Sequence, residues 1–252
     1  MTSAGRLHVG AMLFTWNIQW YNGSKRKGIV DMFLKVGHRG ARAYETENTL
    51  ASFARAITLG ANAIELDVRQ SKDGRLIVCH DDNLKKVFDI DLPVGQASLK
   101  ELKNMTGGKI TTLEESLGFI GSRAEKILVE LKEPGYEKKV IDHIINEKMD
   151  SRVIIVSFHE KVLAAARKLN AKIETGLIYA KFKNPVEAAL KLNAQYLLPL
   201  YRFVHTKDVE KAHKNRLKVI VWTINTKEEA MKFVAKGVDG IATDRPDILY
   251  PA

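Results

Sequence analysis

Two pairs of charged side chains stand two residues apart inside apolar segments of this 252-residue sequence. Glu65 and Asp67 interrupt the segment AIELDV, and Glu130 and Lys132 interrupt ILVELK. Alternate residues of a strand point to the same face, so the members of each pair project together. Carboxylates buried side by side repel each other, and a divalent cation between them removes this cost. We therefore expect Glu65, Asp67 and Glu130 to bind Mg²⁺ or Ca²⁺, with Mn²⁺ as a further choice; a buried Glu–Lys network is the structural alternative.

Two histidines, His38 and His80, each follow a short apolar segment. A single histidine at such a place is usually structural, but two beside a carboxylate cluster favour catalysis. Phosphoryl transfer needs a base and an acid, and imidazoles titrate near neutral pH. Arg39 and Lys132 would then hold phosphate oxygens. Trp222 offers a flat apolar wall to a substrate, or packs at the end of a strand.

A repeated pattern of apolar strand, loop and amphipathic helix must position these side chains. Most of the strands are continuously apolar, which is typical of parallel strands buried on both faces. We expect strands at 35–38, 63–68, 127–132, 153–158, 174–179, 196–200, 218–224 and 240–244. Helices are expected at 49–60, 136–148, 159–169, 185–193, 206–215 and 226–236.

Eight strands alternating with helices favour an α/β fold of the TIM (β/α)8 barrel type. A doubly wound open sheet is the alternative, but no GxGxxG motif follows the first strand. The active site of a TIM barrel lies at the carboxyl ends of its strands, where the charged residues above are placed. We assign the barrel to residues 35–252 and an N-terminal extension of unclear role to residues 1–34.

The segment SKDGRLIVCHDDNL, residues 71–84, breaks the alternation. Its Asp-Gly pair predicts a turn, so this segment forms a strand–turn–strand with the preceding strand. Residues 81–126 are longer than an ordinary barrel loop and include predicted helices near 98–104 and 112–120. They are interpreted as containing a small insertion over the strand ends.

The composition is that of an ordinary globular protein, with 45% hydrophobic and 28% charged residues. The net charge of +10 attracts anions, but the basic residues are dispersed and no nucleic-acid-binding motif is present. The single cysteine, Cys79, is typical of a reducing compartment. With no long apolar segment and no signal peptide expected, a cytoplasmic location is predicted. The aromatic segment 11–21 leaves open a weak contact with a membrane surface, and nothing indicates an oligomeric state.

Six motifs stand in an order that resembles the glycerophosphodiester phosphodiesterase family. They are GHRGARAYETENTL, ELDVRQSKDGRLIVCHD, VELK, VSF, VWTIN and DGIATDRP, across residues 36–247. The resemblance implies a TIM barrel that uses a divalent metal to hydrolyse glycerophosphodiesters to glycerol 3-phosphate and an alcohol. The family's motif residues fall on His38, Arg39, Gly40, Glu65, Asp67, His80, Asp81, Glu130, Lys132 and Trp222.

The chain departs from the family pattern at two places. Thr46 stands where the family usually has a proline, and LKKVFDI follows the His-Asp pair in place of a Leu-x-Arg-Thr-Thr pattern. The second segment lines the substrate entrance in such enzymes, so the leaving alcohol stays unassigned.

The function expected from these residues is metal-dependent phosphodiester hydrolysis with the two histidines as acid and base. The attacking group is water or the substrate's own glycerol hydroxyl. One alternative is a lysophospholipase D acting on lyso-glycerophospholipids. A metal-independent phosphatidylinositol phospholipase C shares the paired histidines, but the acidic triad argues against it. A non-catalytic phosphate- or nucleic-acid-binding barrel leaves the three carboxylates unexplained.

Overall fold

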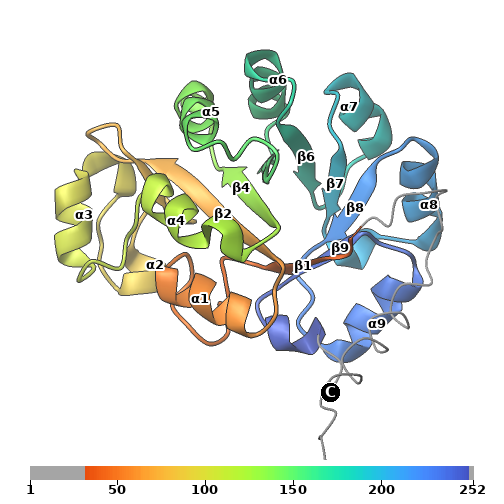
Figure 1. Cartoon of the computed structure of the whole chain (residues 1–252), viewed down its shortest axis with the longest axis horizontal. Coiled ribbons are helices and arrows are strands. Elements are labelled where there is room, and N and C mark those ends of the chain that lie inside the picture. The colour runs from red at the N-terminus through yellow and green to blue at the C-terminus, as the bar shows by residue number, and fades with distance from the viewer. Residues whose placement is uncertain (1–31, 250–252) are drawn as a thin grey trace, which may run out of the picture. The chain divides into compact units, whose positions relative to one another are not determined.

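The computed structural model describes residues 32–249, in which parallel strands close into an eight-stranded barrel (Figure 1). Strand β1 closes the barrel because it pairs in parallel with both β2 and β9. The barrel strands are β1 (Leu34–Gly37), β2 (Ala63–Gln70), β4 (Lys126–Leu131), β5 (Val153–Ser157), β6 (Glu174–Tyr179), β7 (Tyr196–Pro199), β8 (Lys218–Val221) and β9 (Gly240–Thr243).

Helices follow the strands and lie around the barrel (Figure 1). They are α1 (Leu50–Thr58), α4 (Leu113–Ile120), α5 (Glu137–Asn146), α6 (Glu160–Leu169), α7 (Pro185–Lys191), α8 (Thr206–Lys214) and α9 (Lys227–Ala235). After β9 the chain forms a short 3₁₀ helix, Pro246–Leu249. Thr49 caps α1 by accepting from the Ser52 N–H, and Gly60 follows the helix with φ of 82°. This left-handed conformation favours glycine, as expected for a helix C-terminus.

The alternation of each strand divides its side chains between two hydrophobic cores. Val36, Leu128 and Ile220 belong to the cluster inside the barrel. Ile64 and Leu66 belong to the larger cluster between the strands and the helices. Every second residue of a strand points into the barrel. The inward-pointing side chains near the strand ends therefore lie at the carboxyl end of the barrel.

The predicted strand–turn–strand is confirmed. Strand β3 (Leu76–Val78) runs antiparallel to the far end of β2, and Gly74 has φ of 76° in the turn between them. The chain then forms the helices α2 (Lys85–Phe88) and α3 (Leu99–Met105). A separate small core stabilises this region; its fully or nearly fully buried members include Ile77, Cys79, Leu84, Val94, Leu102 and Ile110. Helix α4 instead packs in the main outer core.

The expected fold class, a TIM barrel, is confirmed, and strand ends differ from prediction by a few residues. The largest difference is the strand predicted at 218–224, which ends at Val221. Trp222 makes only an isolated bridge with Leu200, and its carbonyl accepts from the Tyr201 N–H at 3.0 Å. The regular strand pairing of β8 stops there because Trp222 bonds to residues of the loop after β7.

The predicted extension at 1–34, apart from residues 32–34, lies outside the described residues, as does the aromatic segment 11–21. Of the helices described, none is both long and apolar enough to cross a bilayer.

Candidate active site

The turn after β1 places His38 and Arg39 at the carboxyl end of the barrel. Arg39 has φ of 54° and Gly40 has φ of 82°, so the chain reverses sharply after the strand. A Cβ atom at Gly40 would lie 2.3 Å from Ser52 Oγ, which leaves no room for a side chain. The reversal also directs the Arg39 N–H onto Glu65 Oε2 at 2.8 Å. The glycine of this motif is therefore required by both backbone conformation and space.

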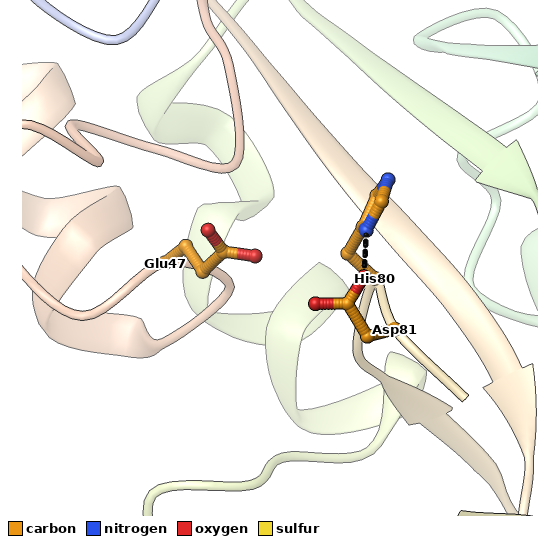
Figure 2. Close-up of side chains that lie close together, drawn as sticks. All are labelled: Glu47, His80 and Asp81. Atoms are coloured by element: carbon orange, nitrogen blue, oxygen red, sulfur yellow. Dashed lines mark hydrogen bonds and ion pairs between the residues drawn. The ribbon is translucent and has the colours of Figure 1, made fainter. Parts of the chain in front are cut away.

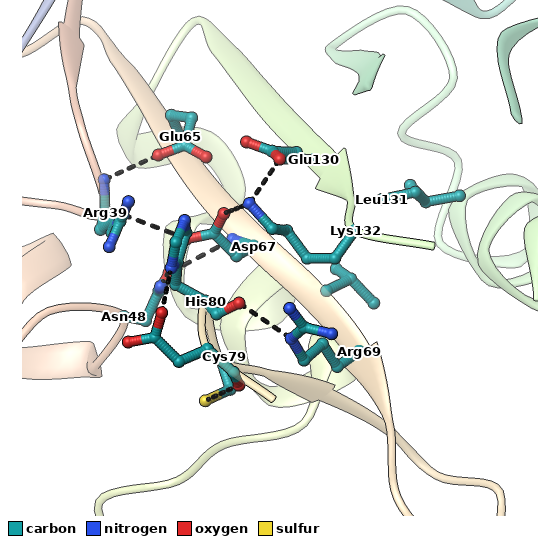
Figure 3. A network of polar contacts seen from close by, with 12 residues as sticks. Arg39, Asn48, Glu65, Asp67, Arg69, Cys79, His80, Glu130, Leu131 and Lys132 are labelled. Carbon is teal, nitrogen blue, oxygen red and sulfur yellow. Dashed lines mark hydrogen bonds and ion pairs between the residues drawn. The ribbon is translucent and has the colours of Figure 1, made fainter. Parts of the chain in front are cut away.

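The three predicted metal-binding carboxylates do meet. Glu65 and Asp67 of β2 and Glu130 of β4 offer oxygen atoms within 4.8 Å of one another, and all three residues are buried. Lys132 lies beside them (Figure 3): its Nζ is 2.5 Å from Glu130 Oε1 and 3.3 Å from Asp67 Oδ1. Both predicted i, i+2 pairs thus project into the same end of the barrel interior.

Burial and neighbouring charges shift the pKa values of these three carboxyl groups in different directions. The pKa of Glu65 is raised well above its ordinary value by burial and by the charges of Asp67 and Glu130. Burial, followed by the charge of Asp67, raises the pKa of Glu130 to about 7. Burial alone would also raise the pKa of Asp67, but the charges of Lys132 and Arg39 outweigh it and lower that pKa to about 2. The cluster therefore has more buried negative charge than its neighbours neutralise.

The donor set fits a hard divalent cation. Glu65 Oε1 is buried and, within residues 32–249, has no hydrogen-bond partner. An unpartnered buried carboxylate oxygen is costly unless it is protonated or bound by a cation. The three members of this group are all carboxylates, the oxygen ligands that Mg²⁺, Mn²⁺ and Ca²⁺ prefer.

A second acidic group nearby has less need of a cation. Glu47, His80 and Asp81 also offer atoms within 4.8 Å of one another (Figure 2). Arg39 Nη1 donates to Glu47 Oε1 at 2.7 Å, and Arg42 Nε lies 2.6 Å from Glu47 Oε2. Because two guanidinium groups already neutralise Glu47, the group around Glu65 is the better candidate metal site.

Each of the two histidines is held by an aspartate. His38 Nδ1 lies 2.7 Å from Asp244 Oδ1, and Asn225 Nδ2 donates to the other oxygen of Asp244 at 2.8 Å. His80 Nδ1 lies 2.8 Å from Asp81 Oδ1. An ionised carboxylate only accepts, so in each neutral imidazole Nδ1 has the proton and Nε2 has the free lone pair. Burial lowers the pKa of His80, which favours its neutral form.

The residues that hold the site together have no role predicted from the sequence. Asn48 Nδ2 donates to Asp67 Oδ2 at 2.7 Å, and the Asp67 N–H donates back to Asn48 Oδ1 at 3.3 Å. Glu47 holds Arg39, and Asp244 holds His38. All three lie within the motifs ETENTL and DGIATDRP, so the signal was present. However, Asn48 and its partner Asp67 are 19 residues apart in the sequence, and Asp244 and its partner His38 are 206 residues apart.

The remaining predicted residue, Trp222, packs against the inner cluster at the end of β8. Its Nε1 donates to the Leu198 carbonyl at 2.7 Å, and its ring meets the exposed Phe158 edge-on at 5.8 Å.

Cys79 is buried, and burial raises its pKa to about 12. This thiol is therefore not a nucleophile at neutral pH.

The sequence model of the glycerophosphoryl diester phosphodiesterase family matches residues 38–248. The chain belongs to the glycerophosphoryl diester phosphodiesterase family. This membership confirms the resemblance described above. Because the chain is a member of this family, it is a phosphodiester hydrolase with a glycerophosphodiester as its small-molecule substrate.

Three similar proteins illustrate the glycerophosphodiester phosphodiesterase family. A glycerophosphodiester phosphodiesterase of Caldanaerobacter subterraneus is 35% identical over 232 residues, covering 86% of this chain and 96% of the relative. The crystal structure of such an enzyme from Thermotoga maritima is 33% identical, with a TM-score of 0.72 and coverage of 85% and 96%. An Oleispira antarctica phosphodiesterase in complex with the product sn-glycerol-3-phosphate is 27% identical, with a TM-score of 0.76 and coverage of 84% and 93%.

Proposed function

We propose that this chain hydrolyses glycerophosphodiesters to glycerol 3-phosphate and an alcohol with a divalent cation on Glu65, Asp67 and Glu130. The observation that supports the proposal most strongly is this buried carboxylate cluster, in which Glu65 Oε1 has no hydrogen-bond partner among the described residues. The cation when bound would polarise a phosphate oxygen and offset the negative charge of the diester. Mg²⁺, Ca²⁺ and Mn²⁺ are the candidates because the donor atoms are all carboxylate oxygens.

His38 and His80 act in this proposal as the acid–base pair. Each has Nδ1 engaged by a carboxylate, so Nε2 is the atom that exchanges a proton with the substrate. One imidazole removes a proton from the attacking group, water or the substrate's glycerol hydroxyl, and the other, protonated beforehand, gives its proton to the departing alkoxide oxygen. The aspartates fix the ring orientation and stabilise the protonated forms.

Arg39 and Lys132 contribute positive charge for the phosphate in this proposal. Both are nearly buried, and both already face Asp67: Arg39 Nε at 3.4 Å and Lys132 Nζ at 3.3 Å. Their cations are thereby fixed before a substrate binds, which lowers the reorganisation required when charge shifts onto the phosphate oxygens. Trp222 is the proposed wall beside the substrate's leaving group.

The test is release of glycerol 3-phosphate from glycerophosphocholine by purified protein, first with EDTA and then with Mg²⁺, Mn²⁺ or Ca²⁺ restored. We expect activity only with added metal. Lysophosphatidylcholine is assayed in parallel, because faster turnover of it would assign the chain as a lysophospholipase D instead. Full activity in EDTA, in protein shown by elemental analysis to be metal-free, would contradict the metal assignment.

A further inference from the structure

Three exposed phenylalanines lie on loops that follow consecutive barrel strands. Phe158 follows β5, Phe182 follows β6 and Phe203 lies after β7; their exposed fractions are 45%, 40% and 44%. These loops follow the carboxyl ends of parallel strands, so they lie at the same end of the barrel as the catalytic residues. Exposed aromatic side chains that share one end of the barrel indicate a contact with an apolar partner.

Basic side chains are interleaved with these rings. Lys181 and Lys183 flank Phe182, and Arg202 precedes Phe203. Lys181 Nζ lies 4.9 Å from the centre of the Phe203 ring, which joins the loop after β6 to the loop after β7. In the part of the chain that the structure describes, neither Lys181 nor Lys183 is in an ion pair. We call these six residues, Phe158, Lys181, Phe182, Lys183, Arg202 and Phe203, the aromatic–basic rim.

A cavity of about 270 Å³ lies behind the rim. Phe182 and Phe203 line it together with Leu197 and Val219, which belong to the core outside the barrel wall. The cavity is therefore separated from the carboxylate cluster, whose side chains point inside the wall. Among the described residues that line it, the acidic one is Asp208, whose Oδ2 accepts from the His205 N–H at 2.8 Å. The rim thus combines two lysines that are in no ion pair among the described residues with a cavity beneath two of its phenylalanines, Phe182 and Phe203.

We propose that the aromatic–basic rim binds an anionic lipid surface. Aromatic rings enter the boundary between headgroups and acyl chains, and lysine or arginine side chains contact anionic headgroups at the same depth. Charge complementarity selects this partner, since the rim is cationic and the whole chain has a net charge of +10. Binding in this way would place the mouth of the barrel beside the membrane.

The proposal goes beyond the glycerophosphodiesterase reaction and does not depend on the roles proposed for the histidines. It predicts that the phosphodiesters nearest the active site include those held at a lipid surface. A monoacyl glycerophosphodiester has a water-facing headgroup and an apolar chain, so it would be delivered to this mouth from the bilayer. Either the rim or the catalytic assignment can fail without the other.

The test is sedimentation of the full chain with phosphatidylcholine vesicles and with vesicles that also contain phosphatidylglycerol. We expect binding to the anionic vesicles only, and loss of binding at high salt. The double variant Lys181→Ser/Lys183→Ser should bind about 30-fold more weakly, since each cation near an anionic surface contributes roughly fivefold. Phe182→Ser/Phe203→Ser should also bind weakly. The matched control is Leu169→Ser/Leu190→Ser. These leucines are as exposed, at 44% and 46%, but they lie near the C-terminal ends of α6 and α7, whereas Phe158 and Phe182 precede the N-terminal ends of the same helices.

Thermal unfolding and glycerophosphocholine hydrolysis are measured for every variant, and both should be preserved in the rim variants. Equal vesicle binding by the rim variants and the wild type would overturn the proposal, as would no binding of the wild type to anionic vesicles. A concentration-dependent dimer that the rim variants lose would assign the surface to a second copy instead. Vesicle binding without any hydrolysis would contradict the proposed function and leave the rim assignment intact.

Discussion

The two ends of the barrel contain the same kinds of polar pair. At the carboxyl end, His38 lies 2.7 Å from Asp244, and Lys132 lies 2.5 Å from Glu130. At the amino end, His213 lies 2.8 Å from Asp239, and Lys126 lies 2.5 Å from Glu174. Pair geometry therefore does not distinguish a catalytic end from a structural one.

The difference is in what surrounds each pair. Lys132 and Glu130 have side chains only 11% and 10% exposed, and they adjoin Asp67 and Glu65. Lys126 and its partner are 23% and 29% exposed. Buried charges in a cluster interact through a medium of low dielectric, so their proton affinities shift, whereas partly exposed pairs are screened by water. A functional site is indicated by convergence and burial of several pairs and not by one pair alone.

The largest effect is expected from removing either histidine of the proposed acid–base pair. His38→Ala and His80→Ala should each lower kcat for glycerophosphocholine by about 10²–10⁴-fold, since each removes one proposed proton-transfer group. The control is His213→Ala, which breaks the His–Asp pair at the amino end and should leave kcat within about twofold. Comparable losses in His213→Ala, or retained activity in both His38→Ala and His80→Ala, would erase the distinction between the two ends.

The second effect concerns the cation. Glu130→Gln should weaken Mg²⁺ binding, measured by calorimetry, by at least the roughly 10–100-fold that follows loss of a residue orienting a metal ligand. Glu174→Gln, the matched change in the amino-end Lys–Glu pair, should leave Mg²⁺ affinity unchanged. Equal affinity in the wild type and Glu130→Gln would remove Glu130 from the metal site.

The same carboxyl group makes metal binding depend on pH. Folding raises the pKa of Glu130 from 4.5 to about 7, so between these values the folded state binds more protons than the unfolded state. This group therefore lowers the stability of metal-free protein as pH rises from 4.5 through about 7. Cation binding requires the ionised form, so the Tm increase caused by Mg²⁺ should be larger at about pH 8 than at about pH 5.5. Glu130→Gln should reduce this difference in a thermal unfolding series.

A smaller effect is expected from the residue that orients His38. Asp244→Asn should lower kcat by about 10–100-fold while leaving KM nearly unchanged, because the imidazole loses its oriented partner. Asp239→Asn at the amino end should leave kcat unchanged. An unchanged kcat in Asp244→Asn would mean that Asp244 only supports the fold.

The smallest effect is expected at the aromatic wall. Trp222→Ala should raise KM by roughly threefold to tenfold with kcat nearly unchanged, as loss of uniform binding does. Trp222→Phe should restore most of the affinity because it keeps an apolar face. A fall in kcat without a change in KM would show that Trp222 acts on the chemistry and not on substrate binding.

Much of the fold follows from local patterns in the sequence. The largely apolar segments predict β2, β5 and β6 to within about two residues, because parallel strands are buried on both faces. Gly60 and Gly237 follow the ends of α1 and α9 with φ of 82° and 81°, close to where the predicted helices 49–60 and 226–236 end. The strand predicted through residue 224 is too long, since its end depends on hydrogen bonds with the loop after β7.

The sequence by itself determined the side-chain types and which of them share a face of the same strand. Glu65 and Asp67 face one side of β2, as do Glu130 of β4 and Lys132 directly after it, because the strand repeat of two is a local property. The parallel barrel and the family motifs also follow from the order of residues alone.

Only the tertiary structure decided which side chains meet. The Asp67 carboxylate is held by Asn48 from the loop after β1 and by Lys132 after β4, and His38 meets Asp244 across 206 residues of sequence. Barrel closure between β1 and β9 makes the last contact, and no local pattern encodes it. Proton affinities follow the same rule, because burial and the distances between charges exist only after the strands have assembled.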